Sequence, residues 1–92
     1  MFKNFIDGEW VEGAGVSRNI NPSDTADLVG EYAQADAAQT RAAIAAARRA
    51  FPAWSLSTPQ QRFDILDAAG TEILARRAEL GDLLAREEGK TL

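Results

Sequence analysis

The chain has 92 residues, a formal net charge of −4 and neither cysteine nor histidine, so it supplies no thiolate nucleophile. Its length allows one small domain, and 18 of its hydrophobic residues are alanines that bury little surface, so a core of its own would stabilise it only marginally. Basic and acidic residues are interspersed, which argues against nucleic-acid binding, and no apolar run approaches the ~20 residues of a membrane span.

Residues 1–35 are predicted to form two β-hairpins. Asp7 and Gly8 lie between two short β-prone runs, and Asp-Gly is a strong signal for a two-residue hairpin turn. Pairing across this turn places Phe5 opposite Trp10, and an aromatic cross-strand pair of this kind favours the register.

The second predicted hairpin pairs Ser17–Asn21 with Leu28–Ala35. The segment between them begins Asn-Pro-Ser-Asp, which is typical of a turn because Pro22 fixes its own φ and keeps the preceding residue extended. Two hairpins alone are not stable in water. We therefore expect these strands to pack against the helices or against a surface outside this chain.

Residues 36–92 are predicted to be helical, and the first helix begins after Asp36. Asp36 and Gln39 resemble a capping box, and Pro52 is predicted to end the helix because it disfavours helical geometry at the residue before it. One face carries the residues with core spacing, which are Thr40, Ile44, Ala47, Phe51 and Trp54.

The second helix has the clearest start signal of the chain. Thr58 is its predicted N-cap, followed by Pro59 and, at the third helical position, by Gln61. Its apolar face consists of Phe63, Leu66, Ala69, Gly70, Ile73 and Leu74. A glycine within a helix costs roughly 1 kcal/mol relative to alanine. We therefore expect Gly70 to allow a close helix crossing.

The third predicted helix spans Ala78–Glu88 and ends at Gly89. Asp82 and Arg86 are four residues apart, a spacing that favours an ion pair on one helix face. Read from the residues alone, the chain is an α+β unit without a self-contained catalytic site.

The order of five sequence runs resembles the amino terminus of aldehyde dehydrogenases. These runs are Asn4–Val11, Asn19–Thr25, Ala50–Ser55, Gln61–Arg62 and Leu84–Leu92. The last run contains Glu-Glu-Gly-Lys-Thr, which looks most like the 2,5-dioxovalerate (α-ketoglutaric semialdehyde) dehydrogenase branch. The resemblance covers essentially all 92 residues and implies the start of a Rossmann-type α/β fold.

The resemblance implies oxidation of an aldehyde to a carboxylic acid with NAD or NADP. In that family a cysteine attacks the carbonyl, hydride passes to the nicotinamide, and a glutamate activates the water that releases the acid. None of these catalytic or cofactor-binding residues has a counterpart in this sequence. Residues 1–92 would be the N-terminal part of the cofactor-binding domain, cytoplasmic and inactive alone, with the rest of a subunit or full-length homologues as partners and a homo-oligomer as the full-length form.

One pair of site residues follows from the resemblance. Many family members bind a monovalent cation through a main-chain carbonyl near the Asn-Pro turn and an acidic side chain just before Gly-Lys. The corresponding positions are Ile20 and Glu87, where glutamate replaces the more usual aspartate.

Two other interpretations remain open from the sequence. The chain could be a standalone docking module that binds full-length subunits through exposed helix faces. It could also be a small α+β structural protein whose resemblance to the family is accidental.

Overall fold

The computed structural model describes residues 1–91. It contains two antiparallel hairpins followed by three helices, as the sequence predicts for an α+β chain. Leu92, the last residue of the predicted helical part and of the last matching run, lies outside the described residues. Strand β4 ends at Gln34 and α1 begins at Ala37, so the change from strands to helices falls near residue 36.

The first hairpin has the predicted register. Strand β1 (Asn4–Ile6) pairs with β2 (Glu9–Val11). Phe5 faces Trp10, and their ring centroids lie 4.8 Å apart. The turn residues Asp7 and Gly8 both have positive φ, 52° and 77°, as the mirror-image turn of a two-residue hairpin requires.

The second hairpin is also present, with boundaries shifted by one or two residues. Strand β3 (Gly15–Ile20) pairs antiparallel with β4 (Leu28–Gln34), with an irregularity in the register between Asn19 and Ile20. On the other edge of β4, Phe2 forms a parallel bridge to Tyr32, and the two rings stack at 5.2 Å.

Helix α1 (Ala37–Ser55) is capped at its N-terminus as predicted, but the capping box is incomplete. The Asp36 side chain accepts a hydrogen bond of 2.8 Å from the Gln39 backbone N–H. The Gln39 side chain does not return to Asp36. It accepts from Asn4 and donates to the carbonyl of Glu12, and so fastens the helix start to the first hairpin.

The prediction that Pro52 ends the first helix is wrong. The helix continues for another turn to Ser55, with Leu56 as its C-cap. Proline removes one N–H donor, which would otherwise bond to the carbonyl four residues earlier, and a helix can kink at this point and continue. Downstream groups complete the last turn, since the Ser55 hydroxyl and the Leu56 N–H both donate to the Pro52 carbonyl.

Helix α2 (Pro59–Ala75) starts with the full capping box that the sequence predicts. Gln61 N–H donates to the Thr58 hydroxyl at 3.1 Å, and Thr58 N–H donates to the Gln61 side-chain oxygen at 2.9 Å. Helix α3 (Arg77–Glu88) begins one residue earlier than predicted and ends at Gly89, which has a left-handed φ of 71°.

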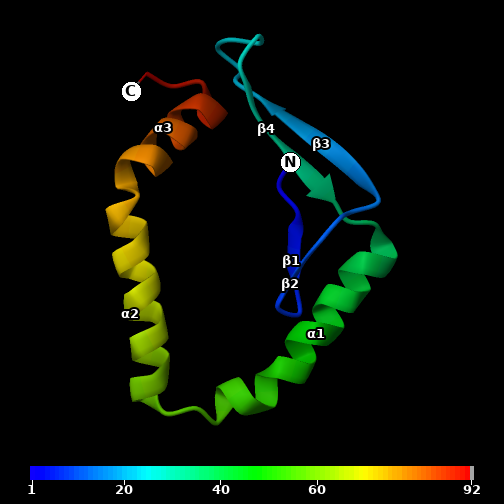
Figure 1. The fold of residues 1–92 in the computed structure, drawn as a ribbon, viewed down its shortest axis with the longest axis vertical. Helices are drawn as coiled ribbons and strands as arrows, with labels where there is room; N and C mark the ends of the chain where they lie inside the picture. Colours follow the sequence, from blue (N-terminus) through cyan, green and yellow to red (C-terminus); the bar gives the residue numbers. More distant parts are fainter. Residues whose placement is uncertain (92) are drawn as a thin grey trace.

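The elements form an open, flat arrangement instead of a compact one. Figure 1 shows α1, α2 and α3 following one another as an arc, with the β1–β2 hairpin inside it near α1 and the end of α3 close to the β3–β4 turn. The radius of gyration is 16.9 Å, whereas a compact domain of this length has about 12 Å. The exposed surface is 7278 Å², roughly 2,000 Å² more than a compact protein of this mass exposes.

The predicted apolar helix faces do not form a core within this chain. Ala46 and Ala85 are the only buried hydrophobic residues in the part of the chain that the structure describes. Phe51 on α1 is 65% exposed and Leu74 on α2 is 67% exposed, although both lie on faces predicted to be buried. The residues with core spacing are therefore exposed here, and nothing within residues 1–91 covers them.

The expectation that Gly70 permits a close helix crossing is also wrong for this chain. A Cβ placed at Gly70 would meet no atom within 4 Å, because no other helix crosses α2 there. Among residues 1–91, no helix combines the length and the apolar character that crossing a bilayer requires.

Candidate cation site and exposed helix faces

The two predicted cation-site residues lie on elements that the fold brings into contact. Ile20 is the last residue of β3 and pairs with Leu28, while Glu87 is in the last turn of α3. The Asn19 side-chain amide donates a hydrogen bond to the Glu87 carboxylate, although 68 positions separate them. The fold therefore places Glu87 against the residue next to Ile20.

The chemistry of this pair fits a hard cation, because a main-chain carbonyl and a carboxylate are both oxygen donors. Two donors fill only part of a shell of about six oxygens, so the others would have to come from the backbone, from water or from another chain. Within residues 1–91, no group of three or more histidine, cysteine or acidic residues converges on one point. The assignment of Ile20 and Glu87 to a cation stays a prediction.

Beside this pair lies an ion pair that the sequence does not predict. The Arg86 guanidinium donates two hydrogen bonds to Asp27, of 2.6 and 2.9 Å, one to each carboxylate oxygen. Both side chains are partly shielded, with exposures of 32% and 26%. The guanidinium, helped by a hydrogen bond from Asn21, lowers the pKa of Asp27 from 3.8 to about 2.

The predicted pairing of Arg86 with Asp82 exists but is the weaker contact. Their charged atoms are 4.0 Å apart, compared with 2.6 Å for Arg86 and Asp27. Spacing along a helix reveals a partner four residues away. It does not reveal Asp27, which the β3–β4 turn brings in from 59 positions away.

A third contact ties the β3–β4 turn to the end of α3. The Ser23 hydroxyl donates to the Gly89 carbonyl at 2.5 Å. A Cβ at Gly89 would lie 2.6 Å from the Ser23 oxygen, so Gly89 serves both the helix end and the close approach of the turn. The sequence indicates the first role of Gly89 only.

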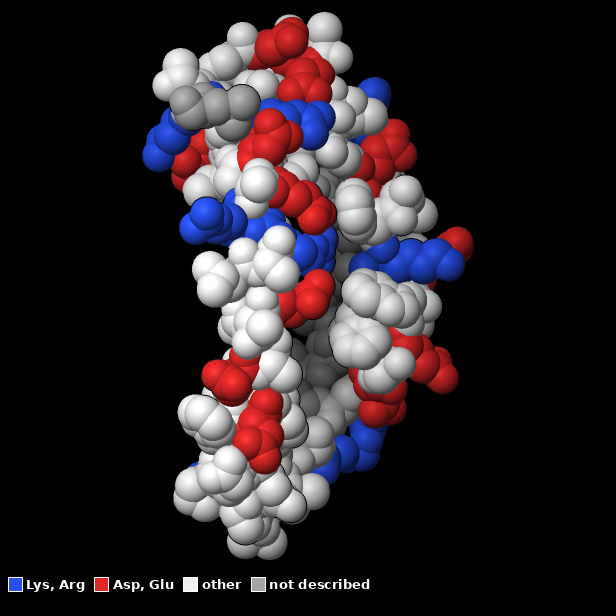
Figure 2. All heavy atoms as spheres, turned by 60° about the vertical axis from the view of Figure 1, so that its left-hand side comes forward, with Lys and Arg blue, Asp and Glu red and all other residues white. Residues whose placement is uncertain are grey.

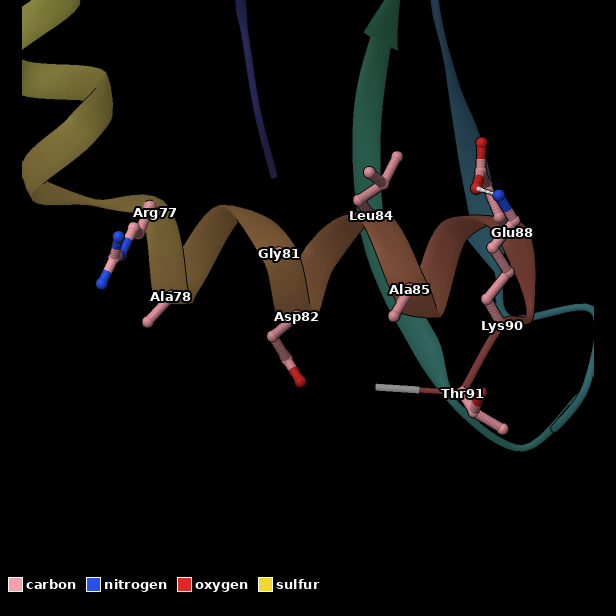
Figure 3. A pocket seen from close by; sticks show the side chains of 9 residues that line it. All are labelled: Arg77, Ala78, Gly81, Asp82, Leu84, Ala85, Glu88, Lys90 and Thr91. Atoms are coloured by element: carbon pink, nitrogen blue, oxygen red, sulfur yellow. Dashed lines mark ion pairs between the residues drawn. The ribbon is translucent and has the colours of Figure 1, made fainter.

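The exposed apolar side chains of the helices line shallow pockets. One pocket of about 500 Å³ lies at the junction of α2 and α3 and includes Gly70, Ile73, Leu74, Leu80 and Leu84. Another, of about 380 Å³, runs along α3 (Figure 3), where Ala78 and Asp82 project from the same side of the helix and Lys90 pairs with Glu88 at its end. The lining of neither pocket includes a cysteine or a histidine.

Charge does not distinguish any part of the visible surface as a binding site for a polyanion. Figure 2 shows acidic and basic side chains interspersed over one face of the molecule, which is hollowed near its middle. Several basic residues are already paired, including Arg49 with Asp7 at 3.5 Å and Arg76 with Glu79 at 2.6 Å. The remaining feature of the surface is its large exposed apolar area.

Known proteins resemble this chain over nearly its whole length. Residues 10–92 match the aldehyde dehydrogenase family. The N-succinylglutamate 5-semialdehyde dehydrogenase of Chromobacterium violaceum is 43% identical over 93 residues that cover the whole chain. That of Caulobacter sp. (strain K31) is 36% identical over 96% of the chain, and the 1-pyrroline-5-carboxylate dehydrogenase 2 of Bacillus subtilis is 35% identical over 92% of it.

These relatives are much longer than the chain. It spans 19% of the Chromobacterium protein, 18% of the Caulobacter protein and 16% of the Bacillus protein. The match to the family extends from the first hairpin through all three helices, so it covers the polar contacts between β3–β4 and α3 as well as the exposed helix faces. The chain belongs to the aldehyde dehydrogenase family.

Proposed function

We propose that this chain is the N-terminal part of the cofactor-binding domain of an NAD(P)-dependent aldehyde dehydrogenase. There it would pack against the rest of the domain and supply no catalytic group. The observation that carries the proposal is the combination of a family match over residues 10–92 with a sequence that has no cysteine. The nucleophile of the reaction therefore has to come from a polypeptide segment other than these 92 residues.

The size of the exposed surface supports the proposal that another polypeptide segment covers a large part of it. The excess of roughly 2,000 Å² over a compact protein of this mass falls in the range that obligate interfaces bury. The exposed side chains on α1 and α2 are large and apolar, as in a protein core divided in two. We propose that the rest of the subunit covers these faces, and that the complete enzyme is a homo-oligomer.

The substrate class is proposed from the relatives. Their names specify a semialdehyde and a pyrroline carboxylate, which are small molecules with an acidic group. The Glu-Glu-Gly-Lys-Thr run of the chain resembles the 2,5-dioxovalerate branch, whose substrate also joins an aldehyde to a short acidic chain. We propose a carboxylate-bearing semialdehyde as the substrate, with 2,5-dioxovalerate and N-succinylglutamate 5-semialdehyde as the compounds to test first.

A chimera tests this proposal. The segment of the Chromobacterium enzyme that aligns with this chain is replaced by residues 1–92, and reduction of NAD and NADP is followed with each semialdehyde. Activity of the chimera, together with no activity of the 92-residue chain alone, supports the proposal. A well-folded chimera that binds NAD but oxidises no semialdehyde would contradict it, and so would turnover by the chain alone.

The docking module is the second candidate function, and the exposed apolar face of α2 is the observation that favours it. Co-purification distinguishes the two. A standalone module should bind an intact full-length relative, whose own first segment is in place. An N-terminal part of the domain should bind only a relative from which the aligned segment has been removed. In an intact relative, that relative's own first segment already occupies the surface.

A further inference from the structure

The end of α3 is held against the second hairpin by four polar contacts. They are the Arg86–Asp27 ion pair, the hydrogen bond from Arg86 to the Leu28 carbonyl, the hydrogen bond from Ser23 to Gly89 and the hydrogen bond from Asn19 to Glu87. All four bridge at least 58 positions of sequence and connect the same two elements, α3 and the β3–β4 hairpin. We call this set of contacts the latch.

Little else fixes the helical arm formed by α2 and α3. In the part of the chain described, no hydrogen bond or ion pair joins α2 to either hairpin. At its N-terminal end, α2 connects to α1 through residues 56–58. Leu56 in this link is 85% exposed, whereas Ser57 donates hydrogen bonds to the Trp54 carbonyl of α1 and accepts one from Arg62 of α2. By contrast, α1 is fastened to the first hairpin through the bonds of Gln39 and the ion pair of Arg49 with Asp7 at 3.5 Å.

The chain therefore consists of a fixed part and an arm. The fixed part contains the two hairpins and α1, and the arm is anchored at one end by covalent linkage and at the other by the latch. Figure 1 shows the two anchor points at opposite ends of the arm. The hydrogen bonds of this link join residues no more than five positions apart, so a change of direction here would break local bonds and no long-range contact.

We propose that the latch is a conformational device that sets the position of the α2–α3 arm. When it is closed, the arm lies as in this structure, and the apolar faces of α1 and α2 have a fixed spacing. When it is open, the arm turns about residues 56–58, and the two faces no longer form one surface. The inference goes beyond the proposed function, since it concerns how this chain holds its own shape.

The strength of the latch is suited to this role. A bidentate arginine–carboxylate pair with partial shielding is stronger and more directional than an exposed ion pair. It is nevertheless hydrated at its edge, because a quarter to a third of each side chain remains exposed. Opening this contact would expose one small buried residue, Ala85 of α3, and no larger core.

A distance measurement between the two parts tests the proposal. The chain has no cysteine, so Glu9→Cys on β2 and Asp67→Cys on α2 provide a unique pair of exposed sites for spin labels. In the doubly labelled parent we expect one narrow distance distribution by pulsed electron resonance. Adding Asp27→Asn should broaden it at least twofold, whereas Asp27→Glu, which keeps the charge, should preserve most of the narrow population.

The matched control is Glu79→Gln. It breaks an ion pair of the same 2.6 Å length, between Arg76 and Glu79, that joins no distant elements. A narrow distribution in this control and a broad one in Asp27→Asn support the latch. If Asp27→Asn loses its helical circular dichroism, the distance distribution is measured in Ser23→Ala instead. This variant removes one hydrogen bond of the latch and no charge. A distribution as narrow as the parent's in the folded latch variant, or a broad one in the parent, would overturn the proposal.

Discussion

Arg86 and Asp27 form two hydrogen bonds of 2.6 and 2.9 Å across 59 positions of sequence. This pair joins the last turn of α3 to the start of β4, and it is the most specific long-range contact of the chain. Around it, Ser23 approaches Gly89 and Asn19 approaches Glu87. The large hydrophobic side chains on α1 and α2, in contrast, are mostly exposed in the described part of the chain.

The Asp27–Arg86 pair should make the free energy of unfolding depend on pH. The pKa of Asp27 is about 2 in the folded chain, below its ordinary 3.8, because Arg86 and Asn21 donate hydrogen bonds to the carboxylate. A carboxylate whose pKa is lower in the folded than in the unfolded chain stabilises the fold at pH values above its ordinary pKa. This stabilisation is lost as the pH falls towards the lowered pKa. The difference in free energy of unfolding between the parent and Asp27→Asn should be constant above about pH 5 and shrink between about pH 4 and pH 2.

Urea unfolding at several pH values, followed by circular dichroism, measures this difference. Two other charged or titratable groups lie near Arg86, namely Asp82 and Tyr32. Asp82→Asn therefore serves as the control and should leave the pH dependence of the difference in place. A difference that stays the same down to pH 2 would show that the carboxylate of Asp27 does not carry the stabilisation.

Replacing Gly70 in α2 and Gly89 at the end of α3 by alanine should change the free energy of unfolding in opposite directions. Gly89 has a φ of 71°, and a Cβ there would meet the Ser23 oxygen at 2.6 Å. Gly89→Ala should therefore lower the free energy of unfolding by about 1 kcal/mol or more. Gly70 lies in open space within a helix, so Gly70→Ala should raise it by up to ~1 kcal/mol.

Denaturant midpoints of the two variants give the comparison directly. Equal effects would mean that neither the left-handed conformation nor the contact with Ser23 constrains Gly89. In the assembled enzyme the sign at Gly70 should reverse if another helix packs there, because a Cβ would then meet a neighbour.

The start of α2 should be sensitive to its hydroxyl cap. Thr58→Ala removes the acceptor for the Gln61 N–H and should lower the free energy of unfolding by ~1 kcal/mol. Thr58→Ser keeps a hydroxyl and should retain most of that stability. Helical circular dichroism during thermal unfolding checks both variants, and an alanine variant as stable as the serine variant would exclude a capping role.

The signals that predicted the fold correctly are local ones. Asp7-Gly8 determines its own turn, and Thr58 with Gln61 forms a cap within four residues, so neither depends on distant parts of the chain. Pro52 was misleading because a helix can kink at a proline and continue. Only one turn follows here, and the hydroxyl of Ser55 helps to complete it.

Signals that involve distant residues could not be predicted in the same way. The face of α2 around Gly70 has the spacing of a buried surface, but spacing does not reveal whether the covering surface lies in the same chain. Arg86 has an acceptable partner in Asp82 four residues away, which hides its stronger partner Asp27. For the cation pair, the resemblance supplied Ile20 and Glu87, and only the fold shows that Asn19 joins them.

The cation prediction can be tested on the chain itself. Sodium or potassium chloride should raise the thermal midpoint by a few degrees relative to tetramethylammonium chloride at the same ionic strength, because a small cation would join Glu87 to the end of β3. Glu87→Gln should abolish this specific increase. The neighbouring Glu88→Gln is the control and should keep it, since Glu88 pairs with Lys90 instead. Equal midpoints in all salts would reject the site.

Hydrogen exchange is the most direct test of whether the apolar helix faces are a docking surface for the catalytic remainder of an aldehyde dehydrogenase. Amide exchange in α1 and α2 is measured for the chain alone and after mixing with the Chromobacterium enzyme lacking its aligned segment. We predict that exchange in both helices is at least tenfold slower in the mixture than in the isolated chain. No change on mixing would contradict the proposal that these helices pack against the rest of the enzyme.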